Sequence, residues 1–357
     1  MENSTELSTF TRLTSVSSIN FTKNFSSQPL RIDVTYLIFS ITTSFLGLIG
    51  NSIVLLVIML NYQKSKKSIA THYIASLALS DLLVSLIYSP TTILQSVYRG
   101  YWIMGAFLCY FSRYSRFIAM FASMLTLTMI AFDRYQAICK PLQCTRTVVR
   151  TRKIILFIWL TSCVICSPDL FLMDYSRETR YPVHNTSYLC RFGLKTGLLF
   201  QEVYTLLRSV ILFYGPCGIV IVCYGRIICE LLHNDKIFKC KQVNYLKKRQ
   251  EKKKVAMLMI FITVFFTCTW AIYWTYSVYY RINRPAHISE IYGLIYWMAW
   301  IPSLSSAVNP FLYAFYGQQF RSQFKGRIKK SQSTLSSKTR SSGAFRSFIW
   351  NRNHSSK

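Results

Sequence analysis

Seven long apolar runs constrain the fold of this chain more than any other feature of its sequence. A helix needs about 20 consecutive apolar residues to cross a lipid bilayer. Hydrophobic residues make up 52% of the 357 residues and charged residues only 15%, whereas soluble domains are about a quarter charged. The sequence therefore predicts an all-α protein, a seven-transmembrane helix bundle with a short amphipathic eighth helix. The predicted spans are Val34–Leu60, His72–Val97, Ala106–Ala137, Ile154–Phe171, Leu198–Leu232, Val255–Tyr279 and Ile288–Phe315.

The basic residues predict how the chain is oriented in the membrane. A net charge of +29 would suit a nucleic-acid-binding protein if the basic residues shared a face with aromatic side chains. They lie instead in blocks between the apolar runs, at Lys64–Lys67, Lys140–Lys153, Lys236–Lys254 and beyond Tyr316. Cytoplasmic loops of membrane proteins carry such an excess of Lys and Arg. We therefore expect a multi-pass plasma-membrane protein with an extracellular N-terminus and no nucleic-acid partner.

This topology divides the chain into four parts. Residues 1–33 are expected to form an extracellular glycosylated N-terminus, 34–316 the bundle, 317–330 the amphipathic helix and 331–357 a disordered cytoplasmic tail. The tail is rich in Ser, Thr and cations, which suits phosphorylation or contact with anionic lipid of the inner leaflet. Four N-glycosylation motifs fall on the expected outer side, at Asn3, Asn20, Asn24 and Asn185.

Cysteine usage predicts one disulfide bond. Most of the eleven cysteines lie in predicted helices or cytosolic loops, where thiols stay reduced. Only Cys109, at the outer start of the third span, and Cys190, in the second outer loop, face the oxidising side. We therefore expect these two to pair and to tie the outer loop over the bundle.

A series of residues at fixed places in the spans carries a family resemblance. In chain order the series comprises Gly50-Asn51, Leu77–Leu83 with Asp81, Trp102, Cys109, Asp133-Arg134-Tyr135, Trp159, Pro168, Pro216, Tyr224, Asn309-Pro310, Tyr313, Phe320 and Phe324. In this series the chain resembles the rhodopsin-like (class A) G-protein-coupled receptors. The runs Met120–Ser123 and Ser167-Pro168 resemble peptide receptors of that family, which suggests the neuropeptide-receptor type.

The resemblance implies a sodium site at the middle of the bundle. Asp81 is a lone carboxylate in an apolar helix, and such a group is costly unless it is paired or neutralised. In the family the matching residue helps to hold a sodium ion, and here Ser123, Ser305 and Asn309, with Asn51 nearby, stand where the supporting polar groups would be. The alternative is a protonated Asp81 in a hydrogen-bond network. No other cofactor or metal is expected.

The resemblance also implies a switch at the cytosolic end. Arg134 would be held at rest by an acid on the sixth helix, Glu251, and released on activation to contact a heterotrimeric G protein. Receptor kinases and arrestin would act on the tail. The residues assigned to coupling and activation are Asp133, Arg134, Tyr135, Tyr224, Glu251, Phe265 and Tyr313.

The sixth span departs from the family pattern. The usual run is Phe, two residues, Cys-Trp, one residue and Pro. Counted from Phe265, Trp270 arrives one position late and the proline is absent. One residue turns a helical side chain by about 100°, so the sequence leaves open whether Trp270 acts as the family's switch. Glu251 lies fourteen residues before Phe265, the separation that the family uses.

Three arginines in the outer halves of the spans suggest the ligand. Arg116 lies seven residues after Cys109, Arg113 and Met120 share its helix face, and Arg208 precedes Pro216 by eight residues. Intramembrane arginines are costly without a function, and guanidinium groups suit carboxylate, phosphate or sulfate. The alternative is that individual arginines pair with Glu202 or Glu290 or reach the interface. The aromatic residues expected around the ligand, or else in simple packing, are Tyr273, Tyr276, Trp297 and Trp300.

These features predict a receptor that binds an extracellular ligand, foremost a peptide, and activates heterotrimeric G proteins. A small anionic mediator, such as a lipid acid, nucleotide or carboxylate, is the alternative ligand. A non-signalling scavenging receptor is the alternative function, because the changes in the sixth span could weaken coupling. Enzyme activity is not expected, since the five histidines are scattered and no nucleophile has a base beside it.

Overall fold

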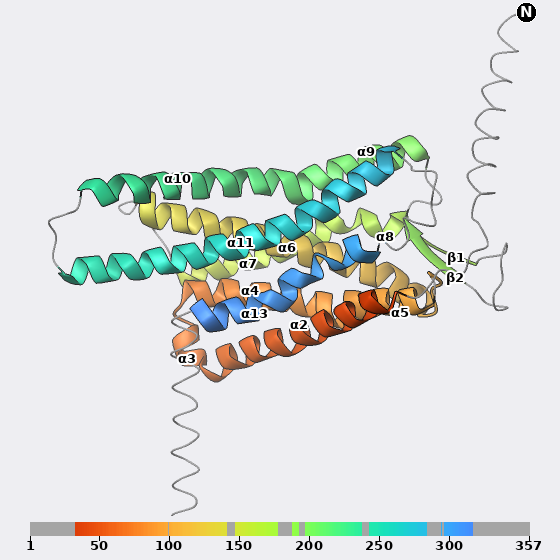
Figure 1. The fold of residues 1–357 in the computed structure, drawn as a ribbon, viewed down its shortest axis with the longest axis horizontal. Helices are drawn as coiled ribbons and strands as arrows, with labels where there is room; N and C mark the ends of the chain where they lie inside the picture. The colour runs from red at the N-terminus through yellow and green to blue at the C-terminus, as the bar shows by residue number, and fades with distance from the viewer. Residues whose placement is uncertain are drawn as a thin grey trace, which may run out of the picture.

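Long helices that lie side by side make up the protein (Figure 1). The computed structural model describes residues 33–98, 100–140, 147–177, 188–192, 197–237, 243–283, 294 and 296–316, with the side chains at 64, 231–237, 243–256 and 314–316 left aside. The helices are α2 (Val34–Leu60), α3 (Tyr62–Ser65), α4 (Ile69–Leu83), η1 (Val84–Tyr88), α5 (Ser89–Val97), α6 (Gly105–Cys139), α7 (Val148–Cys166), α8 (Pro168–Leu172), α9 (Leu198–Ser209), η3 (Val210–Tyr214), α10 (Gly215–Ile237), α11 (Val243–Asn283) and α13 (Ser303–Tyr316). The strands are β1 (Met173–Arg177) and β2 (Tyr188–Phe192).

Six helical segments of the described chain are long and apolar enough to cross a membrane. They correspond to the first six predicted spans: Val34–Leu60, Ile69–Val97, Gly105–Cys139, Val148–Leu172, Leu198–Glu230 and Met257–Asn283. Of the seventh predicted span, 288–315, the described part is helical at 296–300 and again in α13. The glycosylation motifs, the predicted eighth helix and the tail lie outside the described residues.

The helices close into a ring around α6. Helix α2 packs against α4 and α13, α13 packs against α11, and α6 contacts α4, α7 and α10. The apolar part of α6 is more buried than that of any other candidate span, because neighbours cover it on most sides. Its buried side chains, Met120, Met124 and Leu127 among them, join those of α10 and α11 in one core.

Two π-helical turns precede two prolines in the spans. In η1 the N–H of Ser89 bonds to the Val84 carbonyl, and in η3 the N–H of Gly215 bonds to the Val210 carbonyl, five residues back in each case. The following residues, Pro90 and Pro216, have no N–H to donate, so the regular pattern cannot continue through them. Each wider turn rotates the helix that follows.

Two glycines of α2 allow it to lie close to its neighbours. A Cβ atom added to Gly50 would come within 2.7 Å of Pro310 Cγ, and one added to Gly47 would meet the Ser85 hydroxyl. The side chain of Asn51, which follows Gly50, donates to the carbonyls of Gly47 and Ser306 at 2.9 Å each. Helix α2 is therefore held directly against η1 and α13.

A β-hairpin at one end of the bundle was not predicted from the sequence. Strands β1 and β2 are antiparallel, with Met173 opposite Phe192, and they lie beyond α5 and α8 (Figure 1). Cys190 of β2 forms a disulfide bond with Cys109 of α6, with 5.7 Å between their Cα atoms, which confirms the predicted pairing. Trp102 is buried beside this bond, and its backbone N–H donates to the Tyr188 carbonyl at 2.8 Å. The hairpin is thus tied to the start of α6.

Candidate functional site

Arg116 is the centre of the site at the hairpin end of the bundle. Its side chain is only 3% exposed, and its Nη1 donates to the Tyr88 hydroxyl, which η1 turns toward α6. The guanidinium carbon lies 4.3 Å from the ring centroid of Tyr88, 4.1 Å from that of Tyr273 and 5.4 Å from that of Trp270. Its Nε and Nη2 have no hydrogen-bond partner. A buried charged donor without an acceptor is costly, so this group is suited to an anion from outside.

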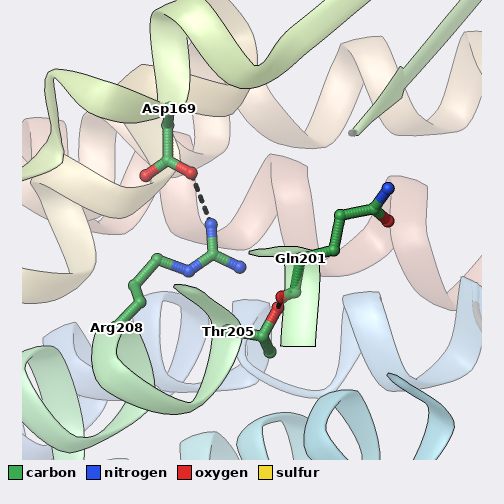
Figure 2. A network of polar contacts seen from close by, with 4 residues as sticks. All are labelled: Asp169, Gln201, Thr205 and Arg208. Atoms are coloured by element: carbon green, nitrogen blue, oxygen red, sulfur yellow. Dashed lines mark hydrogen bonds and ion pairs between the residues drawn. The ribbon is translucent and has the colours of Figure 1, made fainter. Parts of the chain in front are cut away.

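Arg208 is paired within the protein. Its Nη1 donates to Asp169 Oδ1, and the two side chains are 10% and 1% exposed. Figure 2 shows the two groups pointing toward each other, Asp169 from α8 and Arg208 from α9. Gln201 and Thr205 lie on earlier turns of α9 in the same view, and Thr205 Oγ1 donates to the Gln201 carbonyl at 2.7 Å. The ion pair joins the ends of the fourth and fifth spans.

The pairing of Arg208 with Asp169 was not predicted from the sequence, which offered Glu202 and Glu290 as alternative partners for the arginines. Glu290 lies outside the described residues. The sequence did contain a signal for the true partner: Asp169 is a carboxylate within the apolar run Ile154–Phe171. A lone carboxylate in an apolar span needs a partner, and Asp169 is such a carboxylate just as Asp81 is.

Arg113 and two aromatic rings connect the three arginines. Arg113 Nη2 donates to Gln95 Oε1 at 2.8 Å, and its guanidinium carbon lies 5.9 Å from the centroid of the same Tyr88 ring that Arg116 contacts. The Phe117 ring lies 5.8 Å from the guanidinium carbon of Arg116 and 4.4 Å from that of Arg208. The structure therefore brings the three predicted arginines together.

The atoms left without partners at this site are mostly donors. They are Nε and Nη2 of Arg116, Nε of Arg208 and the indole nitrogens of Trp270 and Trp274, against one acceptor, Asp169 Oδ2. In the described residues the one carboxylate that pairs with any of the three arginines is Asp169. Excess donors and positive charge in a buried site favour a ligand rich in acceptors and negative charge.

Three of the other predicted ligand residues lie on α6 or α11: Met120 on α6, and Tyr273 and Tyr276 on α11. Tyr273 contacts Arg116 directly. Met120, one turn along α6 from Arg116, is buried in the core and contributes to its packing. Tyr276 is partly buried, its ring stacks with that of Tyr280 at 6.2 Å, and its hydroxyl has no partner.

Trp297 and Trp300 face α2 instead of the arginines. The Trp297 indole donates to Asp33 Oδ2 and the Trp300 indole to Thr43 Oγ1, each at 2.9 Å. Both rings also pack edge-on against Phe39 of α2. These contacts favour the packing alternative for the two tryptophans, because their polar atoms are already used within the protein.

Comparison with known proteins identifies the family. The family model described as "7 transmembrane receptor (rhodopsin family)" matches residues 50–313. The chain belongs to the rhodopsin family. It is therefore a class A G-protein-coupled receptor, a multi-pass membrane protein and not an enzyme, which confirms the resemblance and the helical-bundle fold expected from the sequence.

The receptor is similar to several peptide receptors. It is 28% identical to neuropeptide FF receptor 2 of Rattus norvegicus over 302 residues, covering 81% of this chain and 71% of that one. It is 26% identical to the pyroglutamylated RF-amide peptide receptor of Mus musculus over 298 residues, covering 79% and 67%. It is also 26% identical to the neuromedin-K receptor of Mus musculus over 310 residues, covering 86% and 66%.

At the predicted sodium site of the receptor, Asp81 and Asn309 are in contact. Asn309 Nδ2 donates to Asp81 Oδ2 at 2.9 Å. The Ser123 hydroxyl is bonded to that of Ser80 at 2.7 Å, and Ser305 Oγ donates to the Pro302 carbonyl at 2.7 Å. Hydroxyl and carboxylate oxygens fit a hard cation, but two of the predicted hydroxyls have other partners here. The hydrogen-bond network accounts for these contacts, and sodium binding stays a prediction.

Three of the residues predicted for coupling, Asp133, Arg134 and Tyr135, lie toward the end of α6 that is away from the hairpin. Arg134 is partly buried after the buried Asp133 at the end of α6, and Tyr135 follows it. Tyr224 is buried on α10, and its hydroxyl lies 3.1 Å from Thr263 Oγ1 of α11. Tyr313 is buried and its hydroxyl has no partner. The side chain of Glu251 is not among those that the structure describes.

Burial in the sixth span bears on where the family run begins. Phe266 and Trp270 are 4% and 3% exposed, and their ring centroids are 6.0 Å apart, whereas Phe265 is partly exposed. Counted from Phe266, Trp270 has the spacing of the family run, with Thr269 replacing the cysteine and Ile272 the proline. The greater burial of Phe266 favours counting the run from that residue, which would place Trp270 at the family's spacing; the role of Trp270 in activation stays untested.

Counting from Phe266 also affects the predicted contact between Arg134 and Glu251. Fourteen residues before Phe266 stands Lys252 and not an acid, with Glu251 one position earlier. Glu251 is still the acid in this basic stretch. Its pairing with Arg134 stays a prediction.

Proposed function

We propose that this receptor binds an extracellular peptide with a free carboxylate, and that Arg116 holds this carboxylate. The observation that carries the proposal is the pair of unpartnered N–H groups on Arg116, a side chain that is 3% exposed. A carboxylate could accept from both groups at once, and such charge-assisted bonds are among the strongest that a protein makes.

A peptide is the preferred ligand because the relatives are named for peptides. Neuropeptide FF receptor 2 and the pyroglutamylated RF-amide peptide receptor are among them. The Arg of an RF-amide sequence is cationic and its amide end is uncharged. Near Arg116 such an end would meet like charge in a site of low dielectric constant, which disfavours binding. The proposed ligand therefore differs from an RF-amide peptide at the end that enters the bundle.

Signalling would follow the pattern of the family. Agonist binding at the hairpin end, taken as extracellular, would favour the active state, in which Arg134 is released to contact a heterotrimeric G protein. Tyr224 and Tyr313 would stabilise the released Arg134, and Phe266 with Trp270 would link the two ends. Receptor kinases and arrestin would act on the tail. The scavenging alternative loses part of its basis, since Phe266 and Trp270 keep the family spacing.

A small anionic mediator is the second candidate ligand. The enclosure of Arg116 by the rings of Tyr88, Tyr273 and Trp270 favours it, because a small carboxylate needs no more than such a site. The two candidates share the contact with Arg116 and differ in whether the ligand extends to the hairpin.

The test is a G-protein activation panel in cells that express the full chain. The panel contains peptides in matched pairs, as free acid and as C-terminal amide, together with small carboxylates. For an active compound, Arg116→Gln is expected to lower potency about 10- to 100-fold, from about 1.5–3 kcal/mol for bonds to a charged group. Arg152→Gln, the same change at the opposite end of the bundle where Arg152 bonds to His72, is the control for expression and folding.

The outcomes separate the candidates. A free acid more potent than its amide, with the difference lost in Arg116→Gln, supports the peptide proposal. Activity confined to small carboxylates selects the second candidate. Equal potency of acid and amide, together with unchanged potency in Arg116→Gln at equal surface expression, would refute the carboxylate site.

A further inference from the structure

We infer that Asp169 is a built-in counterion that occupies Arg208 and so limits the ligand site to one buried carboxylate, the one bound at Arg116. This inference rests on the proposed function and adds a residue that determines specificity. The inference follows from a difference between two buried arginines of one site, only one of which has a carboxylate partner. Arg208 has a carboxylate of the protein on its Nη1, whereas Arg116 has none.

The Asp169–Arg208 pair is enclosed within the bundle. Asp169 is 1% exposed, and aromatic rings surround the guanidinium group of Arg208. The ring centroids lie between 4.4 and 5.4 Å from its central carbon and belong to Phe117, Phe192, Tyr204 and Trp274. Aromatic faces attract a cation but cannot neutralise it. Asp169 is therefore the group that balances the charge of Arg208.

The two arginines are close enough for one ligand to reach both. The Phe117 ring contacts both guanidinium groups, at 5.8 Å from Arg116 and 4.4 Å from Arg208. The distance between the guanidinium carbons of Arg116 and Arg208 therefore cannot exceed the sum of these two distances. A short dicarboxylate could therefore place one carboxylate at each arginine if Arg208 were open.

Asp169 prevents a second ligand carboxylate from binding at Arg208. A ligand carboxylate near Arg208 would lie beside the Asp169 carboxylate, and two buried like charges repel strongly. Such repulsion against the wrong ligand is an established route to specificity. The site with Asp169 in place suits a ligand with one carboxylate at this depth, and Asp169→Asn, nearly the same shape without the charge, should admit two.

The experiment measures thermal unfolding of the full-length receptor purified in detergent. A thiol-reactive dye reports unfolding, because Cys166, Cys217 and Cys223 are free and buried. The probes are acetate and glutarate at equal concentration and constant ionic strength. In the unaltered receptor both acids should raise the Tm to the same extent, since one carboxylate is bound in either case.

Asp169→Asn should behave differently in two respects. Without added acid its Tm should fall by about 5 °C or more, because a buried guanidinium group loses its counterion. Glutarate should then restore more of the Tm than acetate, because it supplies the missing second charge. An Asp169→Asn receptor with unchanged Tm and equal responses to both acids would overturn the inference.

Two further variants control for folding and for loss of a buried carboxylate. Asp174→Asn removes another buried carboxylate at the same end of the bundle and should create no preference for glutarate. The double variant Asp169→Asn with Arg208→Gln removes both charges, so it should recover Tm and respond equally to both acids. Recovery of the double variant would support the counterion role even if Asp169→Asn alone did not fold. A double variant that still prefers glutarate would count against it.

Arg116→Gln separates failure of this inference from failure of the proposed function. If this variant loses the response to acetate while Asp169→Asn gains no preference for glutarate, the carboxylate site stands and the counterion role falls. If Arg116→Gln responds to acetate as fully as the unaltered receptor does, or if neither acid raises the Tm of that receptor, the carboxylate site itself fails.

Discussion

The packing of Gly50 against Pro310 gives a prediction whose magnitude follows from the structure. A Cβ atom at Gly50 would lie 2.7 Å from Pro310 Cγ and 2.9 Å from its Cβ. Carbon atoms pack best at about 3.5–4.0 Å. The atoms of a proline ring cannot rotate away as a flexible side chain can, so Gly50→Ala must push α2 and α13 apart.

The expected change in stability has two opposing parts. Overpacking of this kind costs about 1–3 kcal/mol. Replacing glycine by alanine within a helix contributes about 1 kcal/mol in the opposite direction. Gly218→Ala is the matched control, because Gly218 is exposed on α10 and a Cβ there meets no atom within 4 Å. The difference between the two variants isolates the overpacking, since the helix preference is common to both.

The assay is the dye-based unfolding measurement of purified receptor. Gly50→Ala should melt below Gly218→Ala by roughly 2–12 °C, from about 1–3 kcal/mol at about 2–4 °C for each kcal/mol. Gly218→Ala should melt at or above the Tm of the unaltered receptor. A Gly50→Ala receptor as stable as Gly218→Ala would refute the close contact between α2 and α13.

Two more predictions concern residues that the sequence assigned to function. Trp300→Phe removes the hydrogen bond to Thr43 and should cost about 1 kcal/mol of stability, seen as a lower Tm. Agonist potency should stay within about twofold. A large loss of potency with unchanged Tm would instead place Trp300 in the ligand site. Glu251→Ala should raise ligand-free signalling a few-fold at equal surface expression, because Arg134 would lose the acid expected to hold it; flat basal signalling would argue against this lock.

Much of the fold could be predicted from local sequence. The length of an apolar run decides whether a helix can cross a bilayer, and that length can be counted without any knowledge of neighbours. The Cys109–Cys190 bond could be predicted from the compartment that each cysteine faces, and the structure confirms it. The grouping of Arg113 with Arg116 could be predicted because both lie on one face of one helix.

The pairings between helices depended on the tertiary structure. The sequence showed that Arg208 needed a partner, but Asp169 lies 39 positions away on another helix, and only the packing of α8 against the rest of the bundle brings it close. In the same way, Phe265 and Phe266 are equivalent in composition, and only the rotation of α11 in the bundle buries Phe266.

The sequence by itself predicted a seven-helix membrane receptor with a group of arginines within its spans, because apolar length, charge and motif spacing are properties of short segments. The tertiary structure decided which arginine is paired, which is open and which tryptophans face α2. Those outcomes depend on the rotation and separation of helices far apart in the chain. A rotation of one residue, about 100°, is enough to exchange a buried side chain for an exposed one.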